Sequence, residues 1–216
     1  MIKENIFEVR KRIASACLKA GRKADTLKVI AVSKNRSIEE IKEAVESGIT
    51  EFGENRVQEA LLKYSAVAAR WHMVGHLQTN KAGEAVKIFD LIQSVDSLRL
   101  AREIDKEALK INKIQDILLE VKISPEEAKF GLRPQETPGV IREVSAFKNI
   151  KIKGLMAIAP IVKNPEEART YFRILKSLRD QIDSRLILSM GMTDDFEAAI
   201  KEGSDMVRIG RAIFEN

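Results

Sequence analysis

Strand and helix patterns alternate along the whole chain, and this alternation limits the fold more than any other feature. Short apolar runs rich in Val and Ile, typical of buried strands, recur at intervals of roughly 20 to 30 residues. Between them lie segments with the apolar spacing of helices. The predicted strands cover residues 28–33, 49–52, 71–75, 89–94, 114–121, 150–156, 185–189 and 205–209, and the predicted helices cover residues 3–20, 37–48, 55–68, 80–87, 97–110, 138–146, 166–182 and 194–202.

Eight strand–helix units in series predict a TIM-type (β/α)8 barrel with an extra N-terminal helix at residues 3–20. No Gly/Ser linker, low-complexity tract or shift in composition interrupts the series, so we expect a single domain over residues 1–216. A doubly wound open sheet is the alternative, because it also alternates strands with helices.

Composition and charge argue against a nucleic-acid-binding protein. The chain has 37 basic and 32 acidic residues, a net charge of +5, but the two signs are interleaved and only 5% of residues are aromatic. We therefore expect no nucleic-acid partner, and an anionic small ligand suits this balance better.

No signal peptide or membrane-spanning apolar run is present, and the single cysteine, Cys17, lies on an apolar helix stripe. These features predict a cytoplasmic protein in which Cys17 is buried.

Lys34 is the first candidate functional residue. If residues 28–33 form a strand, alternation places Ile30, Val32 and Lys34 on one face, at the strand's carboxyl end. An ammonium beside these apolar neighbours is partly desolvated, which favours the neutral amine that condenses with an aldehyde or ketone. A lysine extending from a strand end into solvent is the structural alternative.

A second set of candidates follows the last two predicted strands. In a closed barrel strand 8 lies beside strand 1, so an inward-facing Arg208 shares a pocket with Lys34. Gly210 permits close backbone approach, and the amides of residues 210–212 open a helix that attracts an anion. The preceding loop adds the hydroxyls of Ser189 and Thr193 on the same side, although Thr193 is equally suited to capping a helix.

The two histidines, His72 and His76, are four residues apart, a spacing that suits a metal site on a helix. Their segment has a strand pattern instead, and no third histidine or paired cysteine completes a zinc site, so we expect no metal. On a strand, the two side chains either line a pocket or belong to the core.

The chain resembles the YggS/PROSC family of pyridoxal-phosphate homeostasis proteins over nearly its whole length. The motifs that carry this resemblance occur in the family's order and are Ala31-Val32-Ser33-Lys34, Phe52-Gly53-Glu54-Asn55-Arg56, Trp71-His72 through Gly75, Leu77-Gln78-Thr79-Asn80-Lys81, Gly154-Leu155-Met156, Leu188-Ser189-Met190-Gly191-Met192-Thr193-Asp194-Asp195 and Val207-Arg208-Ile209-Gly210. Together they are far more specific than any one alone.

The resemblance implies a barrel like the N-terminal domain of alanine racemase, with pyridoxal 5′-phosphate (PLP) held as a Schiff base on Lys34. By position, the residues that resemble the family's phosphate-binding set are Ser189, Thr193, Gly210 and Arg211. Arg208 resembles the arginine that faces the pyridine nitrogen, and Asn55, His72 and Met156 resemble residues near the ring. The chain departs from the commoner pattern at Arg211, in place of a small hydroxyl residue, and at His76. We therefore expect Arg211 to use only its backbone amide.

The function implied is PLP binding in vitamin B6 homeostasis without established turnover, with PLP-dependent apo-enzymes as possible recipients. An arginine only donates hydrogen bonds, so Arg208 leaves the pyridine nitrogen unprotonated and the ring a poor electron sink. Racemases of this fold also use a second domain and a tyrosine, whereas Tyr64 and Tyr171 lie in predicted helices and the chain ends at Asn216. A PLP-dependent racemase or decarboxylase and a cofactor-free class I aldolase are the alternatives. With no extended exposed apolar stripe, we expect a monomer.

Overall fold

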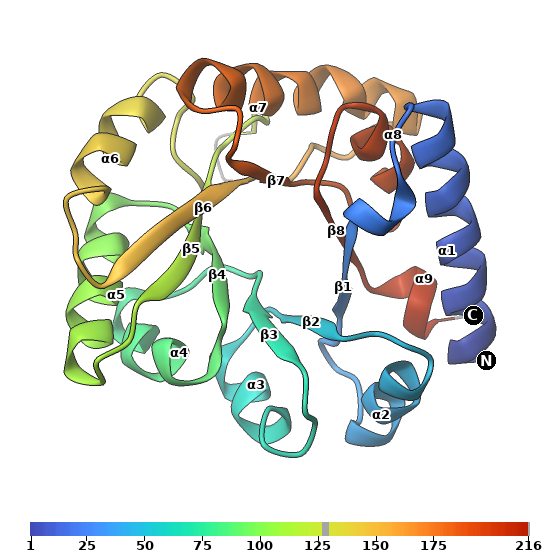
Figure 1. Ribbon diagram of the computed structural model, residues 1–216, viewed down its shortest axis with the longest axis horizontal. Coiled ribbons are helices and arrows are strands. Elements are labelled where there is room, and N and C mark those ends of the chain that lie inside the picture. Colours follow the sequence, from blue (N-terminus) through green and yellow to red (C-terminus); the bar gives the residue numbers. More distant parts are fainter. Residues whose placement is uncertain (127–129, 216) are drawn as a thin grey trace.

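The protein is a closed barrel of eight parallel strands in sequential order, β1 to β8 (Figure 1). The computed structural model describes residues 1–126 and 130–215; residues 127–129 fall in the predicted loop after strand 5. The strands are β1 Lys28–Val32, β2 Glu51–Glu54, β3 Arg70–Met73, β4 Leu91–Val95, β5 Gln115–Glu120, β6 Ile150–Met156, β7 Ile187–Ser189 and β8 Met206–Ile209. The TIM-type barrel is therefore confirmed and the open sheet is excluded, because β8 pairs with β1.

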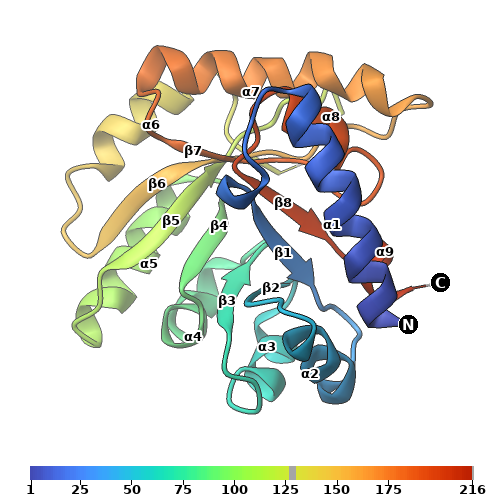
Figure 2. The same ribbon diagram turned by 45° about the vertical axis from the view of Figure 1, so that its right-hand side comes forward.

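Helices surround the barrel, one after each strand, and an additional helix precedes β1 (Figure 2). They are α1 Ile2–Lys19, α2 Ile38–Glu46, α3 Val57–Lys63, α4 Ala82–Ile88, α5 Leu98–Lys110, α6 Thr137–Val144, α7 Ala168–Ile182, α8 Phe196–Lys201 and α9 Arg211–Phe214. The predicted extra N-terminal helix is α1, which packs against α2, α8 and α9. Cys17 lies on its buried face, as expected.

Several predicted boundaries differ from the structure by a few residues, and two of these differences have a clear physical reason. β2 begins at Glu51 rather than at residue 49, because residues 48 and 49 form the turn that ends α2. Gly48 adopts φ +86°, and the Ile49 N–H donates to the Ala44 carbonyl at 3.0 Å. α3 ends at Lys63 rather than at residue 68, since the chain leaves the helix and buries Val67 before β3 begins. By contrast, Ser37 and Glu40 form the capping box that the sequence predicts.

The inside of the barrel is only partly apolar. Side chains from five strands form a small interior cluster, Ile30, Leu91, Leu118, Met156 and Met206, separate from the larger core between the barrel and the helices. Buried polar side chains from β3, β4, β7 and β8 share this interior, among them His72, Gln93, Ser189 and Arg208. Buried polar groups require hydrogen-bond partners, so this interior is the part of the fold where we expect a functional site. No helix among the described residues is long and apolar enough to cross a membrane.

Candidate functional site

Lys34 lies in a turn directly after β1. The turn is closed by the Arg36 N–H donating to the Ser33 carbonyl at 3.1 Å, and Asn35 adopts a left-handed conformation with φ +58°. Lys34 is exposed, so the expectation of a partly desolvated ammonium was wrong. The turn carries the side chain past the end of the strand, where the walls of the barrel no longer cover it.

A buried ion pair behind β1 holds this turn in place. The Lys63 ammonium donates to the Glu54 carboxylate at 2.7 Å and to the Ser33 carbonyl at 2.8 Å, and the Ser33 hydroxyl donates to the same carboxylate oxygen at 2.7 Å. Burial raises the pKa of Glu54, and the hydrogen bonds from Lys63 and Ser33 oppose that rise. Glu59 accepts a hydrogen bond from the Asn35 N–H at 3.1 Å. Both residues that flank Lys34 are therefore fixed, and sequence reasoning identified neither contact.

Arg208 is brought beside β1 by the register of the barrel. It pairs with Ile30, four residues before Lys34, and both face inward. Its guanidinium donates to the Ser189 hydroxyl at 2.7 Å and to the Ala157 carbonyl at 2.9 Å. Burial lowers the pKa of Arg208 to about 10, while the charges of Glu120 and Asp195 oppose that shift. The group is a cation at neutral pH, and among the described residues no carboxylate lies within ion-pair distance of it.

The loops after β7 and β8 meet next to the Lys34 turn. The Ala212 N–H donates to the Thr193 hydroxyl at 3.4 Å, and a Cβ on Gly210 would lie 3.3 Å from the Val32 carbonyl oxygen. Gly191, with φ +95°, would place a Cβ 2.5 Å from that of Ala199, so this turn requires glycine. The loops after strands 7 and 8 are the usual phosphate site of such barrels. The predicted phosphate residues Thr193, Gly210 and Arg211 are thus neighbours.

Two predicted phosphate ligands are engaged elsewhere. The exposed side chain of Arg211 forms an ion pair with Asp194 in the loop after β7. That Arg211 uses only its backbone amide for phosphate stays a prediction. Ser189 is fully buried inside the barrel, where its hydroxyl accepts from Arg208 and donates to Gln93 at 2.6 Å. Its role in phosphate binding stays a prediction.

The residues predicted near the ring lie at different depths. Asn55 is half-buried after the end of β2, where a Cβ on Gly75 would lie 2.5 Å from its carbonyl oxygen. Met156 is buried at the end of β6, paired in register with Ser189. His72 lies deeper in the barrel, between Gln93 (2.9 Å) and Glu51 (3.0 Å). Register therefore groups Met156 with Ser189, whereas His72 contacts Glu51 at the amino end of β2.

His76 lies at the carboxyl end of β3, the same end of the barrel as Lys34. Its ring stacks on Phe130 with 3.6 Å between centroids and 12° between planes, and its Nδ1 is 3.1 Å from Asp96. His72 and His76 do not converge, and the part of the chain that the structure describes has no group of three potential metal ligands. Both histidines line the inside or the mouth of the barrel, one of the roles left open by the sequence.

Glu120 and Gln93 are buried polar residues of the barrel that sequence reasoning missed. Burial raises the pKa of Glu120 to about 7, the nearby charge of Asp96 adds to the rise, and Arg208 opposes it. Alternation along β5 and β4 was the available signal, since it places Glu120 on the face of Leu118 and Gln93 on the face of Leu91. Polar residues on the inward face of a barrel strand are costly without a role, so both were detectable in principle.

The model of the family described as "Alanine racemase, N-terminal domain" matches residues 2–215. Fold and site together thus define an alanine racemase N-terminal-type barrel. A "Pyridoxal phosphate homeostasis protein" of Aquifex aeolicus is 42% identical over 219 residues, covering 98% of this chain and 96% of that protein. An Escherichia coli K12 protein of the same name is 36% identical and covers 99% and 95%. The chain therefore belongs to the pyridoxal phosphate homeostasis protein family.

A solved structure agrees with this assignment. The structure of PipY of Synechococcus elongatus with PLP bound has a TM-score of 0.85 and 34% identity, and the match covers 99% of this chain and 100% of that one. PipY without PLP matches with a TM-score of 0.87 at the same identity. The likeness extends over the whole barrel in both structures.

Proposed function

We propose that this protein binds PLP as a Schiff base on Lys34 and serves vitamin B6 homeostasis by holding the cofactor. The observation that carries the proposal is the register of β1 with β8, which pairs Ile30 with Arg208 and so directs Lys34 and Arg208 toward one end of the barrel. An exposed amine, a buried guanidinium and a hydroxyl-and-amide turn around Thr193 match the aldehyde, ring nitrogen and phosphate of PLP. PipY, a relative solved with PLP bound, supports the same reading.

Each group in the donor set has a distinct task. The Lys34 amine supplies the nucleophile for the aldehyde, and its exposure leaves it accessible to an incoming cofactor. Thr193 and the amides of Gly210 and Arg211 face the phosphate. Gly210 fits this task because a Cβ there would lie only 3.3 Å from the Val32 carbonyl oxygen, so a side chain would crowd β1. When bound, PLP supplies an electron-withdrawing ring, and the protein's part is to bind and orient it.

The holding role rests on the chemistry of Arg208. A guanidinium has no acceptor and keeps its proton at neutral pH, so it donates to the ring nitrogen rather than protonating it. That arrangement weakens the ring as an electron sink. Tyr64 is exposed at the end of α3 and Tyr171 packs on the core from α7, so neither is placed for acid–base work inside the barrel.

One observation favours the alternative, a PLP-dependent racemase or decarboxylase. Glu120 is a buried carboxyl with a pKa of about 7, near Arg208, and such a group is suited to proton transfer at neutral pH. A racemase needs two acid–base groups, and Lys34 with Glu120 supplies a candidate pair. This alternative predicts sustained conversion of an amino acid by the PLP-loaded protein.

The test combines absorbance with product analysis. Wild-type protein mixed with PLP is expected to develop the visible band of a Schiff base, and Lys34→Ala, with an unchanged circular dichroism spectrum, is expected to lack it. Wild-type protein saturated with PLP but without this band would overturn the proposal. Incubation with single L-amino acids and chiral chromatography separates holding from catalysis, because turnover lost in Lys34→Ala would identify an enzyme.

The proposal also covers domain organisation, oligomeric state, localisation and partners. We infer a single-domain, monomeric, cytoplasmic protein that exchanges PLP with PLP-dependent apo-enzymes. Light scattering after size exclusion tests the monomer, with dimer mass as the contrary result. Transfer is tested by adding PLP-loaded protein to a PLP-free apo-enzyme with a trap for free PLP present. Activation of the apo-enzyme despite the trap supports direct transfer, and complete loss of activation contradicts it.

A further inference from the structure

Four buried polar side chains connect in series along the inside of the barrel. Arg208 donates to Ser189 at 2.7 Å, Ser189 donates to Gln93 at 2.6 Å, and Gln93 Nε2 is 2.9 Å from His72 Nδ1. All four are at most 3% exposed. His72 Nε2 then lies 3.0 Å from Glu51 Oε2, with an alignment that falls short of a hydrogen bond. We call these five residues the polar column.

The two ends of the polar column fix the direction of every hydrogen bond in it. Arg208 can only donate, so Ser189 accepts from it and directs its own proton to Gln93 Oε1. At the other end an ionised Glu51 can only accept, which favours a proton on His72 Nε2. His72 Nδ1 is then an acceptor and faces the Gln93 amide N–H. All donors therefore point from Arg208 toward Glu51, and hydrogen bonds aligned in this way polarise and strengthen one another.

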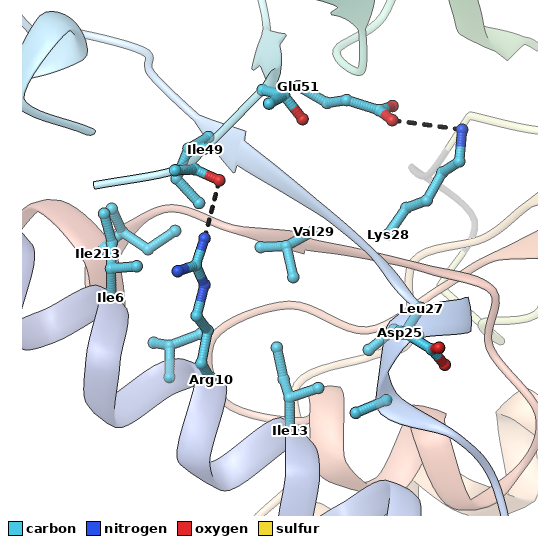
Figure 3. A pocket seen from close by; sticks show the side chains of 14 residues that line it. Ile6, Arg10, Ile13, Asp25, Leu27, Lys28, Val29, Ile49, Glu51 and Ile213 are labelled. Atoms are coloured by element: carbon cyan, nitrogen blue, oxygen red, sulfur yellow. Dashed lines mark hydrogen bonds and ion pairs between the residues drawn. The ribbon is translucent and has the colours of Figure 1, made fainter. Parts of the chain in front are cut away.

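The lower end of the polar column is anchored near the amino ends of β1 and β2. Figure 3 shows Lys28 reaching Glu51, with 3.3 Å between the ammonium and Oε1. Burial raises the pKa of Glu51, but His72 and Lys28 outweigh burial and lower that pKa to about 2. Both residues line a pocket of about 430 Å³ between α1 and these strands, closed on one side by Arg10 donating to the Gly48 carbonyl at 2.8 Å. The anchor is thus a stable anion held from outside the barrel.

We propose that Gln93, supported by His72 and Glu51, is a positioning residue that orients Ser189 and through it the Arg208 guanidinium. The proposal rests on the proposed function, in which Arg208 faces the ring of PLP. The Ser189 proton is committed to Gln93, so Ser189 presents a lone pair to Arg208 and serves the arginine instead of donating to the phosphate. Without the Ser189 lone pair, the Arg208 guanidinium keeps one hydrogen bond to the residues that the structure describes, the one to the Ala157 carbonyl.

The first experiment compares two buried glutamines. Gln93→Met removes the acceptor for Ser189 and is expected to weaken PLP binding at least tenfold and to shift the absorption band of bound PLP. Gln115→Met is the matched control, because Gln115 is also fully buried on a strand, but its side-chain amide donates to the Asp90 and Asp116 carbonyls, which lie outside the polar column. It should lower stability while leaving PLP affinity and the band unchanged. A folded Gln93→Met with wild-type affinity and band would overturn the proposal.

A double-mutant cycle tests whether Gln93 acts through Ser189. If it does, Gln93→Met made in a Ser189→Ala background should change PLP affinity less than threefold, because the path is already broken. Independent, additive losses would contradict the proposal. If Gln93→Met fails to fold, Gln93→Glu takes its place, since a carboxylate keeps the acceptor for Ser189. Its PLP affinity should stay within threefold of wild type, and a tenfold loss would refute positioning through that acceptor.

The polar column can also be tested without PLP. The chain has only two histidines, so a spectrum of protein labelled with nitrogen-15 histidine has two rings to assign, with His76→Gln as the aid. In the PLP-free protein the neutral imidazole of His72 should carry its proton on Nε2. A proton on Nδ1 would reverse the direction of the column and overturn the proposal. A wild type that binds no PLP but shows this tautomer would refute the proposed function and leave the column supported.

Discussion

Lys63→Met removes the buried ammonium that donates to the Ser33 carbonyl, at the start of the turn that contains Lys34. The loss leaves the fully buried Glu54 carboxylate and the Ser33 carbonyl without their charged donor, at 2.7 and 2.8 Å respectively. Breaking one partner of a buried pair costs about 3–5 kcal/mol, and two lost hydrogen bonds to a charged group give a similar sum, roughly 3–6 kcal/mol. At about 2–4 °C per kcal/mol for a chain of this size, the melting temperature should fall by roughly 6–20 °C.

Thermal unfolding followed by circular dichroism, with urea titration at 25 °C, measures this effect. Lys106→Met is the control, because Lys106 pairs with Glu103 on the exposed surface of α5 and its loss should leave the melting temperature unchanged. Lys63→Met/Glu54→Met should recover more than half of the loss, since no unpaired buried charge remains. A single Lys63→Met variant that melts within 1 °C of wild type would refute the buried-pair argument.

Three further changes test other parts of the barrel. The pKa of Glu51 is lowered from 4.5 to about 2, which contributes stability above pH 4.5 that is lost toward pH 2. In urea titrations over this pH range, wild type should therefore lose about 3 kcal/mol more stability than Glu51→Gln. Glu120 has the opposite sign: its pKa is raised from 4.5 to about 7, so wild type should lose about 3 kcal/mol relative to Glu120→Gln as pH rises from 4.5 to 7. For either residue, a difference in unfolding free energy between variant and wild type that does not change with pH would contradict the shifted pKa. Gly154→Ala would place a Cβ 2.0 Å from the Ile187 carbonyl oxygen and should abolish soluble expression, whereas unchanged melting would show that β6 and β7 are further apart.

Alternation and strand order were sufficient to predict the barrel and the pairing of β1 with β8, which sets Arg208 beside Ile30. Both follow from local rules: inward residues repeat every second position, and closure places β8 beside β1. The family motifs then supplied the ligand. The exposure of Lys34 matches the structural alternative, a lysine extending from the strand end into solvent. Alternation alone could not select that alternative, because it depends on a turn whose geometry is set by Ser33, Asn35 and their distant partners.

Local sequence patterns could not predict the polar contacts that support the site, and the reason is physical. Lys63 reaches Ser33 across 30 residues and Ser189 reaches Gln93 across 96, so each pairing exists only once the barrel is closed. The sequence places a lysine on a helix and a glutamine on a strand, which are ordinary positions for both residues. Only the closed barrel shows that the lysine donates to the turn that contains Lys34 and that the glutamine accepts from Ser189, the partner of Arg208.

The central claim is that Lys34 is the residue that holds PLP. Borohydride reduces a Schiff base to a stable secondary amine, so protein mixed with PLP, reduced and digested should yield a phosphopyridoxyl group on the peptide that contains Lys34. Mass spectrometry should find this modification at close to one per chain, with Lys28 and Lys63 unmodified and no labelling of Lys34→Ala. Modification spread over surface lysines, or unchanged in Lys34→Ala, would contradict the account.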